Sequence, residues 1–208
     1  MTTQQETAAE PDRTVEQKIQ QLRELYADAP EVGKTALQNA LQEGGTSWMS
    51  EPRTRMKSAG RVGNRQGRVS ELTLIAPFAE GGAERLRGLL QLREGNFDDT
   101  DRLGTVHDMR FVFLDNDTNL LFATAYDDAW DPYIDDFATK IPNELDLFFC
   151  NCVGWPGIHS PSVKDWIEKY QVTADGWYVA NPDLTVVETR RLNRVGHALD
   201  EFLDKISD

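Results

Sequence analysis

The feature that most constrains the fold is a β-hairpin predicted between residues 105 and 126. The stretch TVHDMRFVFL, residues 105–114, is rich in β-branched and aromatic residues, and LLFATAY, residues 120–126, reads as the returning strand. The intervening DNDTN supplies Asp and Asn, which favour tight turns. A hairpin needs further strands or helices to bury one of its faces. The flanking segments should therefore complete a sheet around it.

Those flanking segments predict an α+β domain. Residues 69–77 alternate as a strand that ends at Pro77, and residues 83–94 form a helix. That helix is expected to bury Leu86, Leu89 and Leu90, with Leu92 as a further candidate. A helix from Pro132 to Lys140 and the strand LDLFFC, residues 145–150, follow the hairpin. The order strand, helix, strand, strand, helix, strand predicts a ferredoxin-like (βαββαβ) antiparallel sheet.

Helical extensions are predicted on both sides of this domain, which spans residues 69–208 with its C-terminal extension. Residues 1–13 are expected to be disordered, and residues 14–50 to hold N-terminal helices that start at a Thr14–Gln17 capping box. A short helix over 162–170 and a short strand GWYVANP over 176–182 precede the last helix. That helix, residues 185–206, carries its apolar side at helical spacing: Val186, Thr189, Leu192, Val195, Leu199, Phe202 and Ile206.

Residues 51–68 are predicted to be a basic linker. They hold six Lys and Arg residues against Glu51 alone, with three glycines and few apolar residues. A contact with an anion or nucleic acid is one interpretation, and a strap lying on an acidic body is the other. The strap is favoured because no aromatic residue is interleaved for base stacking.

The charge balance limits the partners. The chain has 35 Asp and Glu against 22 Lys and Arg, a formal net charge of -13, which repels nucleic acid and anionic membranes. No apolar run approaches the roughly 20 residues of a membrane span, and the N-terminus lacks the layout of a signal peptide. We expect a cytoplasmic protein with no nucleic-acid or membrane partner. Cys150 and Cys152 are too close along a strand to bridge easily, so we expect free thiols.

Three stretches together resemble a family of largely uncharacterised bacterial proteins. They are GTVHDMRFVFLDNDTNLLFATAYDDAWDPYIDDF, LDLFFCNCVGWPG and DWIEKYQVTADGWYVANPDLTV, and the resemblance covers roughly residues 69–200. One departure is Asp128, where that family usually has Gly. Some relatives are labelled catalase- or peroxidase-related, and the fold is similar to the dimeric α/β barrels, which include haem-binding dye-decolourising peroxidases and chlorite dismutases. The resemblance therefore implies a homodimer and a haem as the candidate cofactor.

The candidate catalytic residues are His107, Arg110 and Asp127. Strand alternation puts His107 on one face with Met109 and Phe111, where it is a candidate base or haem ligand, or a hydrogen-bonded structural histidine. Arg110 is expected near the partner strand of the hairpin and near Asp127 at its end, and such an Arg–Asp pair is either structural or, in a haem pocket, able to assist peroxide cleavage.

Further candidates concern cofactor and metal binding. His197 on the last helix is a second candidate haem ligand. Cys150, Cys152 and His159 lack the paired spacing of a zinc site, so no metal is predicted there. The five aspartates between 127 and 136 lack calcium-loop spacing. Asp131, before Pro132, is predicted to cap a helix, which leaves Asp127 as the aspartate with a candidate function.

We interpret the sequence as a small-molecule-binding protein with an apolar aromatic pocket. The pocket residues would be Phe111, Tyr126, Trp130, Trp155 and Tyr178. Haem-assisted, peroxidase-like oxidation is the activity that the family resemblance implies for it. The alternative is a non-catalytic interaction or assembly module, in which the N-terminal helices and the basic segment dock on a partner. The absence of a nucleophile–base constellation, a phosphate loop or a metal cluster in the sequence favours this alternative.

Overall fold

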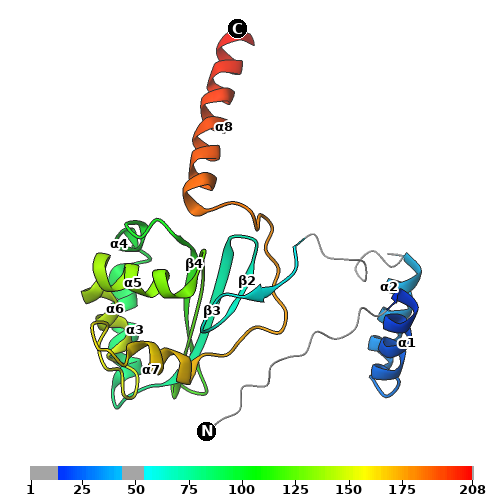
Figure 1. Cartoon of the computed structure of the whole chain (residues 1–208), viewed down its shortest axis with the longest axis horizontal. Helices are drawn as coiled ribbons and strands as arrows, with labels where there is room; N and C mark the ends of the chain where they lie inside the picture. The colour runs from blue at the N-terminus through cyan, green and yellow to red at the C-terminus, as the bar shows by residue number, and fades with distance from the viewer. Residues whose placement is uncertain (1–13, 44–53, 208) are drawn as a thin grey trace. The chain divides into compact units, whose positions relative to one another are not determined.

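The computed structural model describes residues 14–43 and 54–207, in two units that divide after Arg53. The first unit holds two helices, α1 (Val15–Leu25) and α2 (Glu31–Glu43) (Figure 1). The predicted capping box is confirmed, because the Gln17 N–H donates to Thr14 Oγ1 at 3.3 Å and the Thr14 N–H donates to Gln17 Oε1 at 2.9 Å. No residue of α1 is buried. The predicted disordered tail, residues 1–13, lies outside the described residues.

The second unit is built on a five-stranded antiparallel sheet in the order β1-β2-β3-β5-β4. Its strands are β1 (Lys57–Ser58), β2 (Asn64–Gln66), β3 (Val69–Pro77), β4 (Val106–Leu114) and β5 (Asn119–Asp127). The predicted strand at 69–77 and the hairpin are confirmed. The hairpin turn contains Asp115, Asn116 and Asp117, all with positive φ, the backbone region that Asn and Asp tolerate best among residues with a side chain.

Six helices accompany the sheet among the described residues of this unit, which makes the fold mixed α/β. They are α3 (Gly82–Arg93), α4 (Asp98–Asp101), α5 (Trp130–Lys140), α6 (Pro142–Phe149), α7 (Val163–Tyr170) and α8 (Val186–Ser207). Figure 1 shows α3 to α7 gathered on one side of the sheet, whereas α8 projects from the unit. In the described part of the chain, no helix has the length and apolar character needed to cross a membrane.

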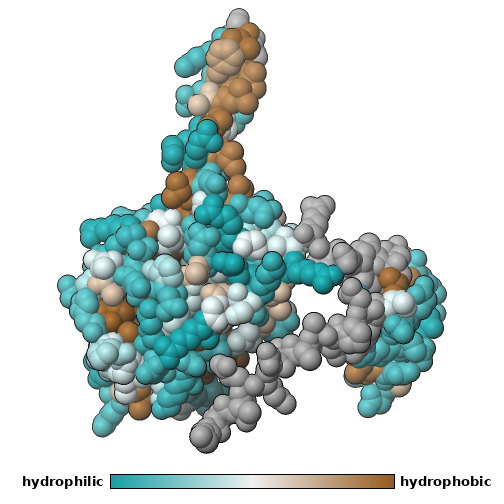
Figure 2. Space-filling model, viewed as in Figure 1, coloured by the Kyte–Doolittle hydropathy of each residue, from teal (hydrophilic) through white to brown (hydrophobic). Residues whose placement is uncertain are grey.

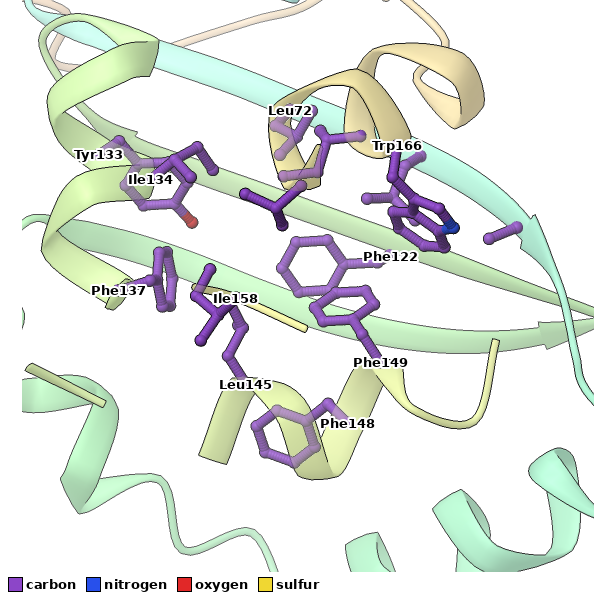
Figure 3. Close-up of a cluster of buried hydrophobic side chains, with 14 of the residues drawn as sticks. Leu72, Phe122, Tyr133, Ile134, Phe137, Leu145, Phe148, Phe149, Ile158 and Trp166 are labelled. Atoms are coloured by element: carbon purple, nitrogen blue, oxygen red, sulfur yellow. The ribbon is translucent and has the colours of Figure 1, made fainter. Parts of the chain in front are cut away.

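The core lies between one face of the sheet and the helices α5, α6 and α7. Alternate residues of β3 and β5 point into it, including Leu72, Leu74 and Phe122, because successive side chains of a strand face opposite sides. The helices contribute Tyr133, Ile134, Phe137, Leu145, Phe148, Phe149 and Trp166 (Figure 3). This aromatic core fixes the position of β5, whose last residue belongs to the site described below.

The strand predicted at residues 145–150 is wrong, because these residues belong to α6. Pro142 occupies the start of that helix, where a missing N–H has no cost. Leu145, Phe148 and Phe149 are buried at helical spacing, while Leu147 between them is exposed. A short apolar run fits a buried strand and a buried helix equally well, so the pattern alone was ambiguous.

The complete ferredoxin-like order is therefore not present. β3 and β4 both run antiparallel to β5, which lies between them, and α3 connects them, as in the first half of that order. The edge of β3 that a last strand would occupy has other neighbours. β2 pairs with Val69 and Ser70, and isolated bridges join Leu74 to Gln171 and Phe78 to Cys152.

Most of the predicted basic linker is folded. Residues 51–53 lie outside the described residues, but β1 and β2 fall within 54–68, and Ala59 and Val62 are buried. The expectation of a linker is wrong there, because these two side chains supply apolar burial. The interpretation as a strap on an acidic body is confirmed at Arg61, whose guanidinium pairs with Asp165 and with Glu168 of α7.

Three smaller predictions also differ from the structure. Residues 176–182 form no strand, and Leu92 of α3 points to solvent. Asp131 is not a helix cap, because α5 begins one residue earlier, at Trp130. The Trp130 N–H donates instead to the carbonyl oxygen of Ala59 at 3.2 Å, so the strap provides an acceptor at the start of this helix.

Candidate functional site: the anchored base of helix α8

A β-bulge sets the position of His107. The β4–β5 pairing is regular from Leu114 to Asp108 and then shifts, so that Val106 pairs with Tyr126 and Asp108 pairs with Ala125. His107 is the extra residue, and a bulge of this kind re-aims a side chain. The predicted alternation is therefore wrong at this end of the strand, since Val106 takes the place on the core side that was assigned to His107.

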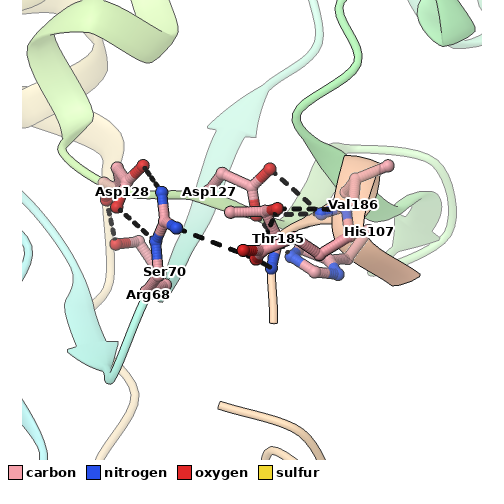
Figure 4. A network of polar contacts seen from close by, with 8 residues as sticks. Arg68, Ser70, His107, Asp127, Asp128, Thr185 and Val186 are labelled. Atoms are coloured by element: carbon pink, nitrogen blue, oxygen red, sulfur yellow. Dashed lines mark hydrogen bonds and ion pairs between the residues drawn. The ribbon is translucent and has the colours of Figure 1, made fainter. Parts of the chain in front are cut away.

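The bulge brings His107 to Asp127, the last residue of β5. The distance from His107 Nε2 to Asp127 Oδ1 is 2.8 Å, and the two side chains are 23% and 6% exposed. The Val186 N–H, at the start of α8, donates to the same carboxylate, at 3.1 Å from Oδ2 (Figure 4). One buried carboxylate thus joins the bulge of β4, the end of β5 and the first residue of α8.

The electrostatics of Asp127 combine two opposing effects. Burial raises the pKa of the Asp127 carboxyl above its ordinary value, whereas the hydrogen bonds from Val186 and His107 lower it, and burial dominates. The positive end of the α8 dipole favours a negative charge at this place. An ionised Asp127 only accepts hydrogen bonds, so His107 donates through Nε2.

A capping box reinforces the base of α8. Thr185 precedes the helix, and its N–H and hydroxyl donate to Glu188 Oε2 at 2.9 and 2.8 Å. The Glu188 N–H donates back to Thr185 Oγ1 at 3.2 Å. The Thr-x-x-Glu spacing of this box is visible in the sequence, although the box is not among the predicted features. Asp127 and the box thus accept from two of the free N–H groups at the start of α8, those of Val186 and Glu188.

Arg68 connects this box to the neighbouring corner of the sheet. Its guanidinium lies 3.0 Å from Asp128 Oδ2 and 3.7 Å from Glu188 Oε2. The Asp128 N–H donates to the Arg68 carbonyl oxygen at 2.7 Å, and the Ser70 hydroxyl donates to the Asp128 carbonyl oxygen. A residue of the supposed linker therefore belongs to the support of α8.

Asp128 has a left-handed backbone, with φ of 61°. Glycine adopts this conformation without steric cost, whereas an aspartate tolerates it at some cost. The ion pair with Arg68 gives the aspartate side chain a local role.

The structure brings together only some of the predicted site residues. His107 and Asp127 are in contact, but the Arg110 side chain is mostly exposed and lies 3.4 Å from Asp108. His197 lies on the exposed part of α8, away from the base. Of the neighbouring aspartates, Asp131 and Asp135 both pair with Lys164.

The five predicted pocket residues do not share a cavity. Tyr126 and Trp130 are fully buried, and Tyr126 stacks on Tyr133 with ring centroids 3.8 Å apart. Phe111 and Trp155 pack against the core, and Tyr178 is almost fully exposed. The cavity among the core aromatic residues has a volume of about 20 Å³, which is room for no more than about one water molecule.

The candidate haem ligands do not fit a haem. His107 directs Nε2 at Asp127, His197 stands on an exposed helix, and the core cavity is far smaller than a porphyrin ring. Among the described residues, no group of three or more His, Cys, Asp or Glu is placed to hold a metal ion. Cys150 and Cys152 are free thiols, as predicted, and burial raises the pKa of Cys152 to about 12.

Beyond its base, α8 leaves the body. Arg190 Nη2 lies 2.6 Å from Asp101 Oδ1, and every residue from Arg190 to Ile206 is exposed. The apolar residues that the sequence placed on one side of this helix are 49–63% exposed: Leu192, Val195, Leu199, Phe202 and Ile206. We call these five residues the stripe. Figure 2 shows hydrophobic residues running along one side of α8 and hydrophilic residues along the other.

Comparison with known protein families, with curated proteins and with solved structures finds no match for this chain.

Proposed function

We propose that the protein is an interaction and assembly module whose contact surface is the stripe of α8. The observation that supports this proposal is the combination of an exposed apolar stripe with a base fixed by Asp127, Thr185 and Glu188. Contiguous exposed apolar surface on a folded protein marks a site of association. Asp127 accepts hydrogen bonds from Val186 at the start of α8 and from His107. A structural role in holding α8 therefore explains the His107–Asp127 pair more simply than a catalytic role does.

A fixed base matters for binding. Most of the stability of a protein helix comes from packing of its apolar face, so a helix with an exposed apolar face becomes more ordered when it binds. The anchor and the capping box order the first turn of α8 in advance, which lowers the entropic cost of association. The same groups keep the stripe at a constant orientation to the sheet.

The test compares two double variants in cell extracts. The stripe variant carries Leu199→Gln with Phe202→Gln, and its matched control carries Asn193→Gln with His197→Gln on the polar side of the same helix. Gln is a good helix former, so both variants keep the helix. In size-exclusion chromatography of the extract, the wild-type chain and the control should elute well above their 23.5 kDa mass, and the stripe variant should elute later.

Equal elution of all three proteins would remove the stripe as the contact surface. Circular dichroism of the purified variants checks that both keep their helix content.

The second candidate function is small-molecule binding with proton transfer at His107. The observation that favours it is the His107–Asp127 pair, because a buried carboxylate that fixes Nε2–H leaves Nδ1 to exchange protons with a ligand. This second candidate function includes a relationship to ferredoxin-like oxidoreductases. The family resemblance and the order of β3, β5 and β4 support that relationship.

Thermal-shift screening of wild-type protein and His107→Gln tests this second function. Stabilising compounds whose effect is lost in His107→Gln would support it. A hemin titration belongs in the same screen, and we expect no Soret band that depends on His107 or His197. Compounds that stabilise both proteins equally would exclude His107 as the binding group.

A further inference from the structure

We propose that α8 pairs in antiparallel orientation with α8 of a second copy of this chain. The inference rests on the proposed function, because it names the partner of the stripe. Three independent features of α8 lead to it: the spacing of the stripe, the distribution of charge along the helix, and the end at which the body is attached.

The spacing of the stripe suits another helix. Its five residues follow one another at intervals of three, four, three and four. This alternation is the 3.5-residue repeat with which two helices interlock along a narrow seam. A helix that packs flat on a sheet needs a wider apolar face. Arg191 and Lys205 border the stripe on one side of the helix, and Leu203, which is 45% exposed, adjoins it on the other.

The charges of α8 are divided between its two halves. Arg190, Arg191 and Arg194 lie in the first half, where Glu188 of the capping box is the one acidic residue. Asp200, Glu201 and Asp204 lie in the second half, where Lys205 is the one basic residue. A helix that is basic at one end and acidic at the other complements a second copy of itself only when the two run antiparallel. A parallel pair would place like charges side by side.

The same distribution is unfavourable for α8 by itself. Arg190 and Arg194 are four residues apart, as are Asp200 and Asp204, and like charges at this spacing destabilise a helix. Arg190 is compensated by Asp101 of the body. For Arg194, Asp200 and Asp204 no ion pair is present within the described residues. A partner helix of opposite charge order would compensate these residues.

The attachment of the body also favours the antiparallel orientation. The body holds α8 at its N-terminal end, through Asp127 and Val186. The exposed part, from Arg190 to Ile206, is about 25 Å long at 1.5 Å per residue. Antiparallel pairing puts the two bodies at opposite ends of the helix pair, whereas parallel pairing crowds them at one end.

The open face of the sheet is a weaker candidate for the contact between copies. Its described residues include one large exposed hydrophobic residue, Val112, next to the charged and exposed Arg110 and Asp108. We therefore assign the contact to α8 and not to the sheet.

The first experiment measures the mass of the purified full-length chain by sedimentation velocity between about 1 and 100 µM, a range suited to a short helical interface. We expect a dimer at the high end for the wild-type chain and for the Asn193→Gln, His197→Gln control. The Leu199→Gln, Phe202→Gln variant should stay monomeric. A wild-type monomer at about 100 µM overturns the inference.

The second experiment determines orientation. Spin labels are attached singly to Asn193→Cys or Asp204→Cys, each in a Cys150→Ser background, and the distance between the two copies is measured by electron paramagnetic resonance. In a parallel pair the two label positions give equal, short distances. In an antiparallel pair the two axial separations together reach at least about 33 Å, because eleven residues separate the labels along each helix. Equal short distances overturn the antiparallel orientation.

The two proposals fail differently. If the purified chain stays monomeric but the large species in extracts still depends on the stripe, pairing with a second copy is rejected and the assembly function is kept. If the stripe variant behaves like the wild-type chain both in extracts and as purified protein, both proposals are rejected.

Discussion

The helices α5 and α8 have similar sequence patterns and opposite surroundings. Each carries large apolar side chains three and four residues apart. In α5 they are buried against the sheet, as Tyr133, Ile134 and Phe137 show, whereas the stripe of α8 is exposed. An amphipathic pattern therefore indicates which side of a helix will be covered, but not whether the same chain or another molecule covers it. For α8, whose apolar side contacts nothing within its own unit, the anchor and the charges indicate the partner.

The largest difference in stability is expected between alanine variants of one phenylalanine in α5 and one in α8. Phe137→Ala should lower the free energy of unfolding by about 3–5 kcal/mol, because it leaves a cavity in the core. Phe202→Ala should change it by less than about 0.5 kcal/mol in monomeric protein, because its side chain is already exposed. Urea unfolding at about 1 µM measures both. Similar losses for the two variants would contradict the contrast between the helices.

The next effect concerns the anchor. Asp127→Ala leaves the Val186 N–H and His107 without their acceptor and should cost about 2–3 kcal/mol. Asp127→Asn keeps an oxygen that can accept from Val186, so its loss should be smaller. Hydrogen exchange at the start of α8 should accelerate in the Ala variant. Unchanged exchange there would show that the capping box alone holds the helix.

The anchor also predicts a pH dependence. Because the folded pKa of Asp127 is raised, its stabilising contribution is complete below the ordinary pKa of 3.8 and is lost as pH rises through the folded value. The wild-type chain should therefore lose stability relative to Asp127→Asn as the pH rises above the ordinary pKa of 3.8. Parallel urea titrations of the two proteins measure the difference. The opposite slope would mean that the hydrogen bonds to the carboxylate outweigh its burial.

The smallest effect is expected beside the anchor. Asp128→Gly removes backbone strain at φ 61° but also removes the ion pair with Arg68, so the two changes should cancel to within about 0.5 kcal/mol. Asp128→Ala removes the ion pair and keeps the strain, and should cost about 1 kcal/mol. Thermal unfolding of both variants separates the two contributions. Equal stability of Gly and Ala would contradict a strained backbone here.

Much of the fold could be predicted from the sequence, where a pattern had one solution. The hairpin, β3, α3, α7 and α8 follow from clear alternation or helical spacing. The run LDLFFC did not, because six apolar-rich residues fit either state, and only Pro142, three residues earlier, points to a helix start. The strap resembles a linker in sequence because its two buried residues, Ala59 and Val62, are small and isolated among charges.

The candidate site was predictable only in part. His107 and Asp127 were singled out, but their contact depends on a bulge, and a change of register leaves no mark in the composition of a strand. The backbone N–H of Val186 could not be foreseen from residue types. The Thr185–Glu188 box could have been read from its spacing, and the stripe was read correctly as a pattern but not as an exposed surface.

The attachment of α8 at one end has a mechanical consequence. The helix is a cantilever, so a sideways force at its tip acts on the base with a lever arm of about 25 Å. The load falls on the Arg190–Asp101 ion pair and on the bond from Val186 to Asp127. Through Asp127 it passes into β5, which is held by hydrogen-bonded ladders on both sides. The torque is therefore taken up by the strand that the sheet holds most firmly.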